Sequence, residues 1–436
     1  MKNHQFKILA FGLVFAVTGI TARAQSCSGC LDPTFGDGGA FILSSANANP
    51  EGMALQTDNK IVALFRENDS ATPELGYLMR FTADGVPDNS FGYGGVVTLN
   101  WGGNSGRVLA LSLQTIGGQQ RIIVGGWESC GPNKQCLRAE AYDANGSLDA
   151  TFASGGVARI SSIGCGPNWI TTQPADQKLL MVGGLCSFTR LTANGQLDTS
   201  FGTSGIASTN FLYQVRGAPV VLSSGKILLP GSIQKKGGVD LAVARYNLNG
   251  SLDDGGRKDS TPGDVFGVSG VGTAHLTTSN TYANWIAVDA AGGIVVAGNQ
   301  AGSSLVTRLL SGGQLDTTFG SNGFAFFNSV PNNFFSAVAL QNDGNIVVAG
   351  SGLTAGNATN DALIARFTAA GALDTSFGAG GWVLHDIYGL YNVGTSPVLM
   401  QPDLSCVGCE KILVIGAVQV TTNPYTWQSY LLRVLK

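Results

Sequence analysis

The chain has 436 residues, a formal net charge of −3, only 12% charged residues and 62 glycines. A mildly acidic chain lacks the basic surface that nucleic acids require, so we expect no nucleic-acid partner. Many glycines lie between short apolar runs, and long amphipathic patterns at helical spacing are absent. This combination predicts an all-β protein built from strands and tight turns.

Residues 1–24 have the features of a secretory signal peptide. Two lysines precede an apolar run from Ile8 to Ile20, and Ala22 and Ala24 have the spacing of a cleavage site. The apolar run is too short for the ~20 residues of a membrane-spanning helix, and no later stretch is long enough. We therefore expect an exported protein without a membrane span, located in the periplasm, at the cell surface or in the medium.

The rest of the chain, residues 25–436, contains seven copies of a closing signature in which a phenylalanine is followed by glycines. The copies centre on Phe35, Phe91, Phe152, Phe201, Phe266, Phe319 and Phe377. Each unit between them is predicted to hold four short strands. In the clearest unit, Ala339–Leu340 precedes an Asp-Gly turn, Ile346–Gly350 is apolar throughout, and Ala362–Phe367 follows. A strand that is apolar at every position fits a sheet covered on both faces.

Seven units of four strands predict a single domain, a seven-bladed β-propeller. An open solenoid or two sandwiches are the alternatives. The chain ends argue against both, because the start carries a fourth strand, Ala40–Leu43, and the end carries a third strand, Tyr430–Leu435. Pairing of these N- and C-terminal strands in one blade would close the ring and leave no free sheet edge at the junction.

The repeated segments around Leu373–Gly378 ("LDTSFG") and Gln341–Gly350 ("QNDGNIVVAG") resemble the delta-60 repeat, a bacterial family of uncharacterised exported proteins. The resemblance covers nearly the whole chain from Leu31 onward and implies a propeller-like array without a known activity. Two copies depart from the pattern. The fifth carries an insertion before Phe266, and the third has Ala153 in place of the first glycine.

An aspartate recurs just before each closing phenylalanine, and we predict a structural role for both residues. The aspartate should accept backbone N–H groups in a tight turn, and the phenylalanine should fill the space between blades. One rim residue per blade cannot converge on one ligand. The aspartates are Asp32, Asp88, Asp149, Asp198, Asp253, Asp316 and Asp374.

Eight cysteines in an exported chain predict disulfides rather than zinc, although Cys27/Cys30 and Cys406/Cys409 also have zinc-ribbon spacing. Both CxxC pairs belong to the closing blade and should lie on the same face, so we predict two bridges between the pairs. Bridges within each pair are the alternative. Two further pairings are expected, Cys130 with Cys136 and Cys165 with Cys186.

Candidate binding residues are aromatic and lie where the fourth strand of one unit leads into the first strand of the next. They should surround the mouth of the central channel, where aromatic faces and nearby amides suit a glycan or a peptide. Packing between blades is the alternative role. The residues are Trp101, Trp169, Tyr213, Tyr282, Trp285, Phe335, Tyr388 and Tyr391.

The sequence is compatible with two classes of function. A monomeric, non-enzymatic binding or scaffold propeller without a cofactor is favoured, because no catalytic motif occurs. The alternative is a propeller enzyme, such as a lyase, lactonase or glycan hydrolase, with a central metal. Its candidates are few: Glu51, Glu128, His385 and Asp386, with a weak Ca²⁺ site in the fifth copy formed by Asp253, Asp254, Asp259 and Asp264.

Overall fold

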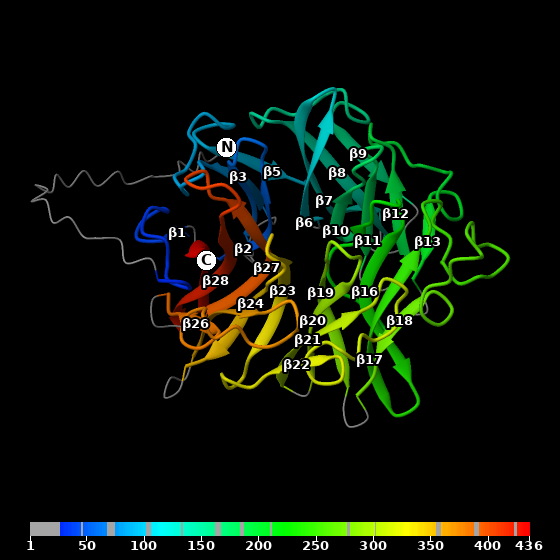
Figure 1. Cartoon of the computed structure of the whole chain (residues 1–436). Coiled ribbons are helices and arrows are strands. Elements are labelled where there is room, and N and C mark those ends of the chain that lie inside the picture. Colours follow the sequence, from blue (N-terminus) through cyan, green and yellow to red (C-terminus); the bar gives the residue numbers. More distant parts are fainter. Residues whose placement is uncertain are drawn as a thin grey trace, which may run out of the picture.

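The computed structural model describes most of the chain beyond the predicted signal peptide, which lies outside the described residues. The described residues are 27–44, 47–67, 75–101, 106–131, 134–161, 167–183, 187–209, 212–276, 280–300, 302–354, 359–387, 392–422 and 425–436. They form seven antiparallel sheets arranged as a ring, a seven-bladed β-propeller (Figure 1). This part of the chain contains no helix that is long and apolar enough to cross a membrane.

Blades 1 to 6 follow one another along the chain, and each is a meander of consecutive strands. In blade 4 the first strand is split in two, so that β14 and β15 both pair with β16. The strands are β2 (Ala48–Leu55), β3 (Ile61–Glu67), β4 (Leu75–Phe81) and β5 (Val96–Asn100) in blade 1; β6 (Gly106–Ile116), β7 (Gln119–Gly131), β8 (Lys134–Asp143) and β9 (Val157–Ile160) in blade 2; β10 (Pro167–Thr172), β11 (Leu179–Gly183), β12 (Ser187–Leu191) and β13 (Ile206–Ser208) in blade 3; β14 (Gln214–Val215), β15 (Val220–Val221), β16 (Ile227–Lys235), β17 (Gly238–Tyr246) and β18 (Val271–Ala274) in blade 4; β19 (Thr281–Val288), β20 (Ile294–Gln300), β21 (Ser303–Leu309) and β22 (Phe324–Phe327) in blade 5; and β23 (Phe334–Leu340), β24 (Ile346–Leu353), β25 (Asn360–Phe367) and β26 (Trp382–His385) in blade 6.

Blade 7 is built from both ends of the chain, as the sequence predicts. β27 (Asn392–Pro402), β28 (Glu410–Thr422) and β29 (Tyr425–Leu435) form three strands, and β1 (Ala40–Leu43) adds the fourth in the order β1-β29-β28-β27. The register runs from Ala40 opposite Leu432 to Leu43 opposite Ser429. This pairing places the first strand beside the last one and closes the ring.

The first strand of each blade is innermost and the fourth is outermost (Figure 1). The second strand has neighbours on both faces. In blade 1, every residue from Ile61 to Phe65 is fully buried. The unbroken apolar runs of the sequence are therefore confirmed as strands sandwiched between adjacent blades.

The seven closing phenylalanines are completely buried and lie between blades, which confirms their predicted role. An arginine guanidinium covers each ring at 4.5 to 5.7 Å from its centroid. The pairs are Arg433/Phe35, Arg80/Phe91, Arg121/Phe152, Arg190/Phe201, Arg245/Phe266, Arg308/Phe319 and Arg366/Phe377.

The recurrent aspartates form Asx turns in six of the seven blades, again as predicted. In blade 6, Asp374 Oδ1 accepts the N–H of Ser376 at 3.1 Å, and its Oδ2 accepts Nε–H of Arg366 at 2.7 Å. The same arginine position in blade 5, Arg308, also donates to the carbonyl of Ala369 in the next blade at 2.7 Å. The aspartate thus holds an arginine that fastens one blade to its neighbour, a role that the turn pattern alone does not reveal.

Blade 2 reaches the same arrangement by a different route. Its third strand has Ala141 where the other blades have arginine, and Arg121 from the second strand supplies the guanidinium instead. Arg121 Nε donates to Asp149 Oδ2 at 2.7 Å, and Arg121 also contacts the carbonyl of Ala193 in blade 3. Blade 2 therefore has a guanidinium at the same place as the other blades, although a different strand supplies it.

The predicted disulfides between the two CxxC pairs are wrong. Cys27 joins Cys30 and Cys406 joins Cys409, with Cα separations of 5.5 and 5.6 Å that suit a disulfide. Each segment closes as a tight turn, in which Cys30 N–H donates to Cys27 O and Cys409 N–H donates to Cys406 O. Each turn therefore places its own two sulfur atoms close enough to bond to each other.

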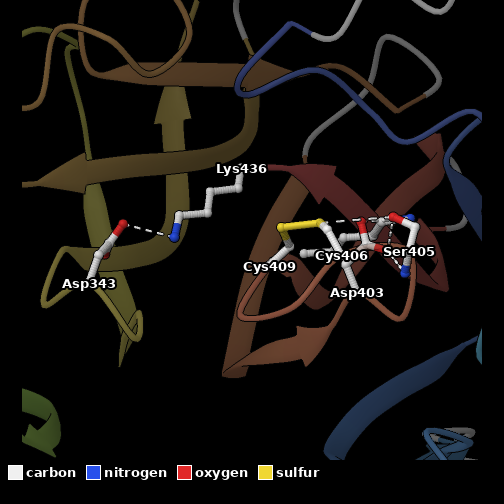
Figure 2. Close-up of a disulfide and its surroundings, with 7 residues drawn as sticks. Asp343, Asp403, Ser405, Cys406, Cys409 and Lys436 are labelled. Atoms are coloured by element: carbon white, nitrogen blue, oxygen red, sulfur yellow. Dashed lines mark hydrogen bonds and ion pairs between the residues drawn. A yellow bond between two sulfur atoms is a disulfide. The ribbon is translucent and has the colours of Figure 1, made fainter.

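The expected proximity of the two CxxC segments is nevertheless present, because Lys411 contacts both Asp32 (2.9 Å) and Asp403 (3.7 Å). Figure 2 shows the Cys406–Cys409 bridge beside Asp403, with the ion pair of Lys436 and Asp343 to one side. Across the hairpin of blade 2, Cys130 joins Cys136, the expected pair. The predicted pair of Cys165 and Cys186 lies outside the described residues.

In blade 1, a continuous segment forms the turn that follows the third strand. In blade 7, the Cys27–Cys30 segment and the C-terminal Leu435 form the equivalent turn together. In blade 1, Gly85 N–H donates to Thr82 O at 3.0 Å; at the equivalent place, Gly29 N–H donates to Leu435 O at 2.9 Å. Leu435 N–H in turn donates to Cys30 O at 2.9 Å. Gly29 has φ +87° and Gly85 has φ +75°, a region that favours glycine. The two chain ends together reproduce one blade turn.

Candidate functional site

Three of the aromatic residues predicted at the channel mouth pack between blades instead. Trp101 is only 2% exposed, and the guanidinium of Arg138 covers its ring at 5.0 Å. Phe335 is fully buried, and Trp285 packs against the cluster that contains it. The innermost strand turns its edge toward the channel, so its side chains point at neighbouring blades. Trp101 and Phe335 therefore cannot stack on a ligand in this conformation, and Trp285 is partly buried.

The remaining predicted residues divide into three groups. Trp169 is half-buried against the cluster between blades 3 and 4. Tyr388 and Tyr391 lie outside the described residues. Tyr213 is 48% exposed, and Tyr282 is half-buried on β19. Among the described residues of this set, Tyr213 is therefore the most exposed, whereas Trp169, Tyr282 and Trp285 are each partly exposed.

A partly buried arginine that the sequence analysis did not single out lies over Tyr282. The Arg216 guanidinium is 5.9 Å from the ring centroid, and it donates to Gln214 Oε1 at 3.1 Å and Asn284 Oδ1 at 3.2 Å. Five arginines have their aspartate eight residues later, as Arg366 has Asp374, and Arg216 has a serine at that distance. Other arginines, such as Arg138, also lack this aspartate, so the sequence alone does not single out Arg216.

The acidic residues of the fifth copy are engaged within the protein. Asp253 is completely buried and pairs with Lys226 at 2.7 Å and with Arg245. Asp264 contacts the same two cations at 2.7 Å each, and Asp259 accepts an Asn247 N–H at 2.7 Å. Asp254 accepts the N–H of Gly256. Lys226 and Arg245 thus neutralise Asp253 and Asp264.

The few residues suggested for catalysis are distributed around the ring. Glu51 pairs with Arg66 at 2.7 Å in blade 1, and Glu128 pairs with Arg138 at 2.6 Å in blade 2. His385 and Asp386 belong to blade 6, and His275, the other histidine in the described residues, contacts Asp240 in blade 4. Within the described residues, no group of three or more His, Cys, Asp or Glu side chains is arranged to hold a metal ion.

A groove of about 800 Å³ lies along the outermost strand of blade 6, beside the closure of the ring. One wall consists of Val330, Pro331 and Leu353, with Trp382 and Leu384 from β26. This volume is within the range of ligand sites, and a mostly apolar lining is typical of them. No sequence pattern indicated the groove, because its walls come from segments far apart in the chain.

The opposite wall of the groove is formed by the N-terminal turn. It contains Val383 and His385 from β26 and the Cys27–Cys30 segment. His385 Nε2 lies 3.2 Å from Gly29 O and, in a neutral ring, donates its hydrogen to it. Burial lowers the pKa of His385 below its ordinary value, and the contact with Gly29 O opposes that shift. Ser28 adds a buried hydroxyl without a partner in the described residues.

The middle of β26 presents main-chain groups to this groove. Arg366 N–H donates to Gly381 O at 2.9 Å, which makes these two residues a hydrogen-bonded pair. Because such pairs alternate along an antiparallel ladder, Val383 and His385 bond to β25, and Leu384 directs its N–H and C=O outward. Outside the ladder with β25, neither group of Leu384 bonds to the backbone of a described residue.

Three segments of the chain match a family described as "Domain of unknown function (DUF5122) beta-propeller". The matched residues are 56–91, 222–255 and 341–377, in blades 1, 4 and 6. These segments support similarity to an uncharacterised family of β-propeller repeats. None of the curated proteins matches the sequence significantly.

Solved structures with a similar shape share little sequence with this chain. A protein from Lactobacillus plantarum is 14% identical, with 82% of this chain and 89% of that chain covered and a TM-score of 0.46. A streptogramin B lyase is 11% identical, with 71% and 94% covered and a TM-score of 0.38. Raptor from Chaetomium thermophilum is 8% identical, with 90% and 28% covered and a TM-score of 0.48. The assignment of the fold therefore rests on the strand topology described above.

Proposed function

We propose that this protein is an exported, monomeric, non-enzymatic binding propeller that takes an extended peptide segment of a partner into the groove along β26. The outward N–H and C=O of Leu384 carry the proposal, because an edge strand can accept a peptide as an additional strand. Cys130–Cys136 and the two closure disulfides support export, together with the signal-peptide pattern of residues 1–24.

The two walls of the groove suit an added strand because side chains of a strand alternate in direction. Trp382 and Leu384 face the apolar wall of Val330 and Pro331, whereas Val383 and His385 face the N-terminal turn. A peptide paired with β26 would send alternate side chains toward either wall. We expect apolar residues at every second position of the peptide.

The proposal also includes two predictions made from the sequence, namely the repeat family and a ligand site at the channel mouth. Assignment to the delta-60 repeat family rests on the repeated LDTSFG signature. The predicted glycan or peptide site at the channel mouth keeps Tyr213 as its most exposed described residue, with Trp169, Tyr282 and Trp285 partly exposed. An enzyme of the lyase, lactonase or hydrolase class is the alternative function, and the separation of His275 and His385 on different blades favours binding.

The test narrows the groove without changing the core. Ala379 lies in the groove wall, and the equivalent turn position of blade 1 naturally holds Tyr93, which is 95% exposed. Ala379→Tyr should therefore fold normally. Ser321→Tyr places the same side chain at the equivalent position of blade 5 and is the matched control.

Random linear peptides displayed on phage are selected on the wild-type protein, and the enriched peptides are measured by fluorescence polarisation. We expect Ala379→Tyr to weaken binding by about tenfold or more and Ser321→Tyr to leave it unchanged. Peptides N-methylated at the residue opposite Leu384 should also lose affinity. Failure to enrich any peptide, or equal binding to Ala379→Tyr, would refute the proposal.

A further inference from the structure

We propose that Arg216 forms a binding site for a carboxylate-bearing ligand between the innermost strands of blades 4 and 5, separate from the groove along β26. The carboxylate would accept hydrogen bonds from the free edge of the guanidinium, beside the ring of Tyr282. This site lies at the start of the innermost strands of blades 4 and 5.

The first observation is the lack of an acidic partner. Arginines at the blade junctions pair with aspartates, as Arg190 does with Asp198 at 2.8 Å. Arg216 is partly buried, yet no carboxylate within the described residues forms an ion pair with it. A partly buried charge without a counter-ion is costly, and an incoming anion would remove that cost.

The second observation is that the guanidinium is held in place by neutral groups. Gln214 Oε1 accepts from Nε and Asn284 Oδ1 accepts from Nη1. Asn284 is itself fixed, since its amide donates to Phe335 O at 2.8 Å and Asn299 Oδ1 at 3.1 Å. Within the described part of the chain, no acceptor takes a hydrogen bond from Nη2. A planar fork held in this way suits bidentate binding of a carboxylate.

The third observation is the local backbone, which places Arg216 where neighbouring blades meet. The first strand of blade 4 is split between β14 and β15, and residues 216–219 occupy the break. Gly217 has φ +80°, and a Cβ there would lie 2.7 Å from Asn284 O in blade 5. On the other side, Thr171 of blade 3 donates its hydroxyl to Pro219 O at 2.8 Å. The split strand thus brings Arg216 to Tyr282 and Asn284.

The charge of the site selects the class of ligand. One guanidinium is present, and no lysine or second arginine contacts it in the described part of the chain, so a singly charged carboxylate is favoured over a phosphate. The guanidinium covers one face of the half-buried Tyr282 ring, and the exposed part of the ring offers apolar contact to a sugar ring. A uronic acid combines both features, and a short dicarboxylic acid shares only the first.

Isothermal titration calorimetry with trigalacturonate, its methyl ester, succinate and inorganic phosphate tests the site on the whole mature protein. We expect trigalacturonate to bind and the uncharged ester to bind about tenfold more weakly or not at all. Binding of succinate with equal affinity would retain the carboxylate site and identify a small acid, rather than a sugar, as the ligand. No binding of either acid, or preferential binding of phosphate, would overturn the proposal.

Variants separate the charge from the fold. Arg216→Gln should abolish binding of trigalacturonate, and Arg216→Lys should weaken it by about tenfold because the fork is lost while the charge remains. Arg257→Gln, an exposed arginine on the insertion of blade 4, is the matched control and should bind as wild type. Ala379→Tyr should also bind normally, so failure of the groove proposal would not affect this result. Equal binding by Arg216→Gln and Arg216→Lys with wild type would contradict the assignment.

Discussion

Arg433 in the last strand donates Nε–H to Oδ2 of Asp32, in the segment just before the first strand, at 2.8 Å. Lys411 contacts the same carboxylate at 2.9 Å. Burial would raise the pKa of Asp32, but the hydrogen bonds from Lys411 and Thr34 and the charge of Arg433 lower it to about 2. One carboxylate therefore joins the two ends of the chain through two cations.

Asp32→Asn should lower the free energy of unfolding by roughly 3 kcal/mol, because it leaves two cations facing a neutral amide in a buried position. Asp374→Asn is the control, since Asp374 faces Arg366 alone and is more exposed. Urea denaturation compares the two variants. An equal loss for both would show that joining the chain ends adds nothing to the ordinary blade contact.

Acid should destabilise the protein as these carboxylates become protonated. The pKa of Asp32 is about 2 in the folded protein and near 3.8 when unfolded, so its contribution of about 2 kcal/mol is complete above pH 4 and is lost as the pH falls toward 2. Urea denaturation at pH 5, 4, 3 and 2 should show this decline. The free energy of unfolding of Asp32→Asn should fall less steeply as the pH decreases. The same pH dependence in this variant and in wild type would contradict the assignment to Asp32.

His385 should add a second pH dependence at higher pH. Burial lowers its folded pKa, so the unfolded chain binds more protons once the pH falls below about 6.5. The folded state is therefore expected to lose stability as the pH decreases from 7 toward 5. His385→Gln keeps a donor for Gly29 O and should remove this dependence, whereas His275→Gln is the control. The urea midpoint of each variant is measured from pH 7 to pH 5. A pH dependence that persists in His385→Gln would contradict the assignment to His385.

Blade 2 allows a test of whether the position of a charge in space, rather than in sequence, stabilises a blade junction. Arg121→Lys should cost about 2 kcal/mol, because lysine cannot cover Phe152 and reach Ala193 O together. Adding Ala141→Arg should restore stability, since it recreates the arginine and lysine of blade 3. Thermal unfolding of the single and double variants measures the rescue. A double variant less stable than Arg121→Lys would refute the equivalence.

Disulfide mapping by mass spectrometry should find Cys27 with Cys30 and Cys406 with Cys409. Cys27→Ser/Cys30→Ser should reduce stability by about 2 kcal/mol, the value expected for so short a loop. Cys130→Ser/Cys136→Ser in blade 2 is the control away from the closure and should leave protection of β1 from hydrogen exchange unchanged. A peptide linking the two CxxC segments would contradict the local pairing.

The repeats in the sequence are sufficient to predict the propeller and its closure, because each blade uses the same short-range features. Asp374 and Phe377 follow from turn chemistry and an apolar period that recur within one unit. The chain starts with the fourth strand of a unit, Ala40–Leu43, and ends with the third strand of a unit, Tyr430–Leu435. Their order within the repeat is enough to predict that they pair. Such features depend on a few neighbouring residues, so the sequence specifies them directly.

The site could not be predicted in the same way, because it depends on contacts between distant segments. Packing decided that Trp101 and Phe335 fill blade interfaces while Tyr282 stays accessible, although all three share one type of position. Turn closure decided that each CxxC bonds internally. The groove beside Leu384 and the cluster around Arg216 exist only where separate blades meet, and the tertiary structure alone determines which side chains meet there.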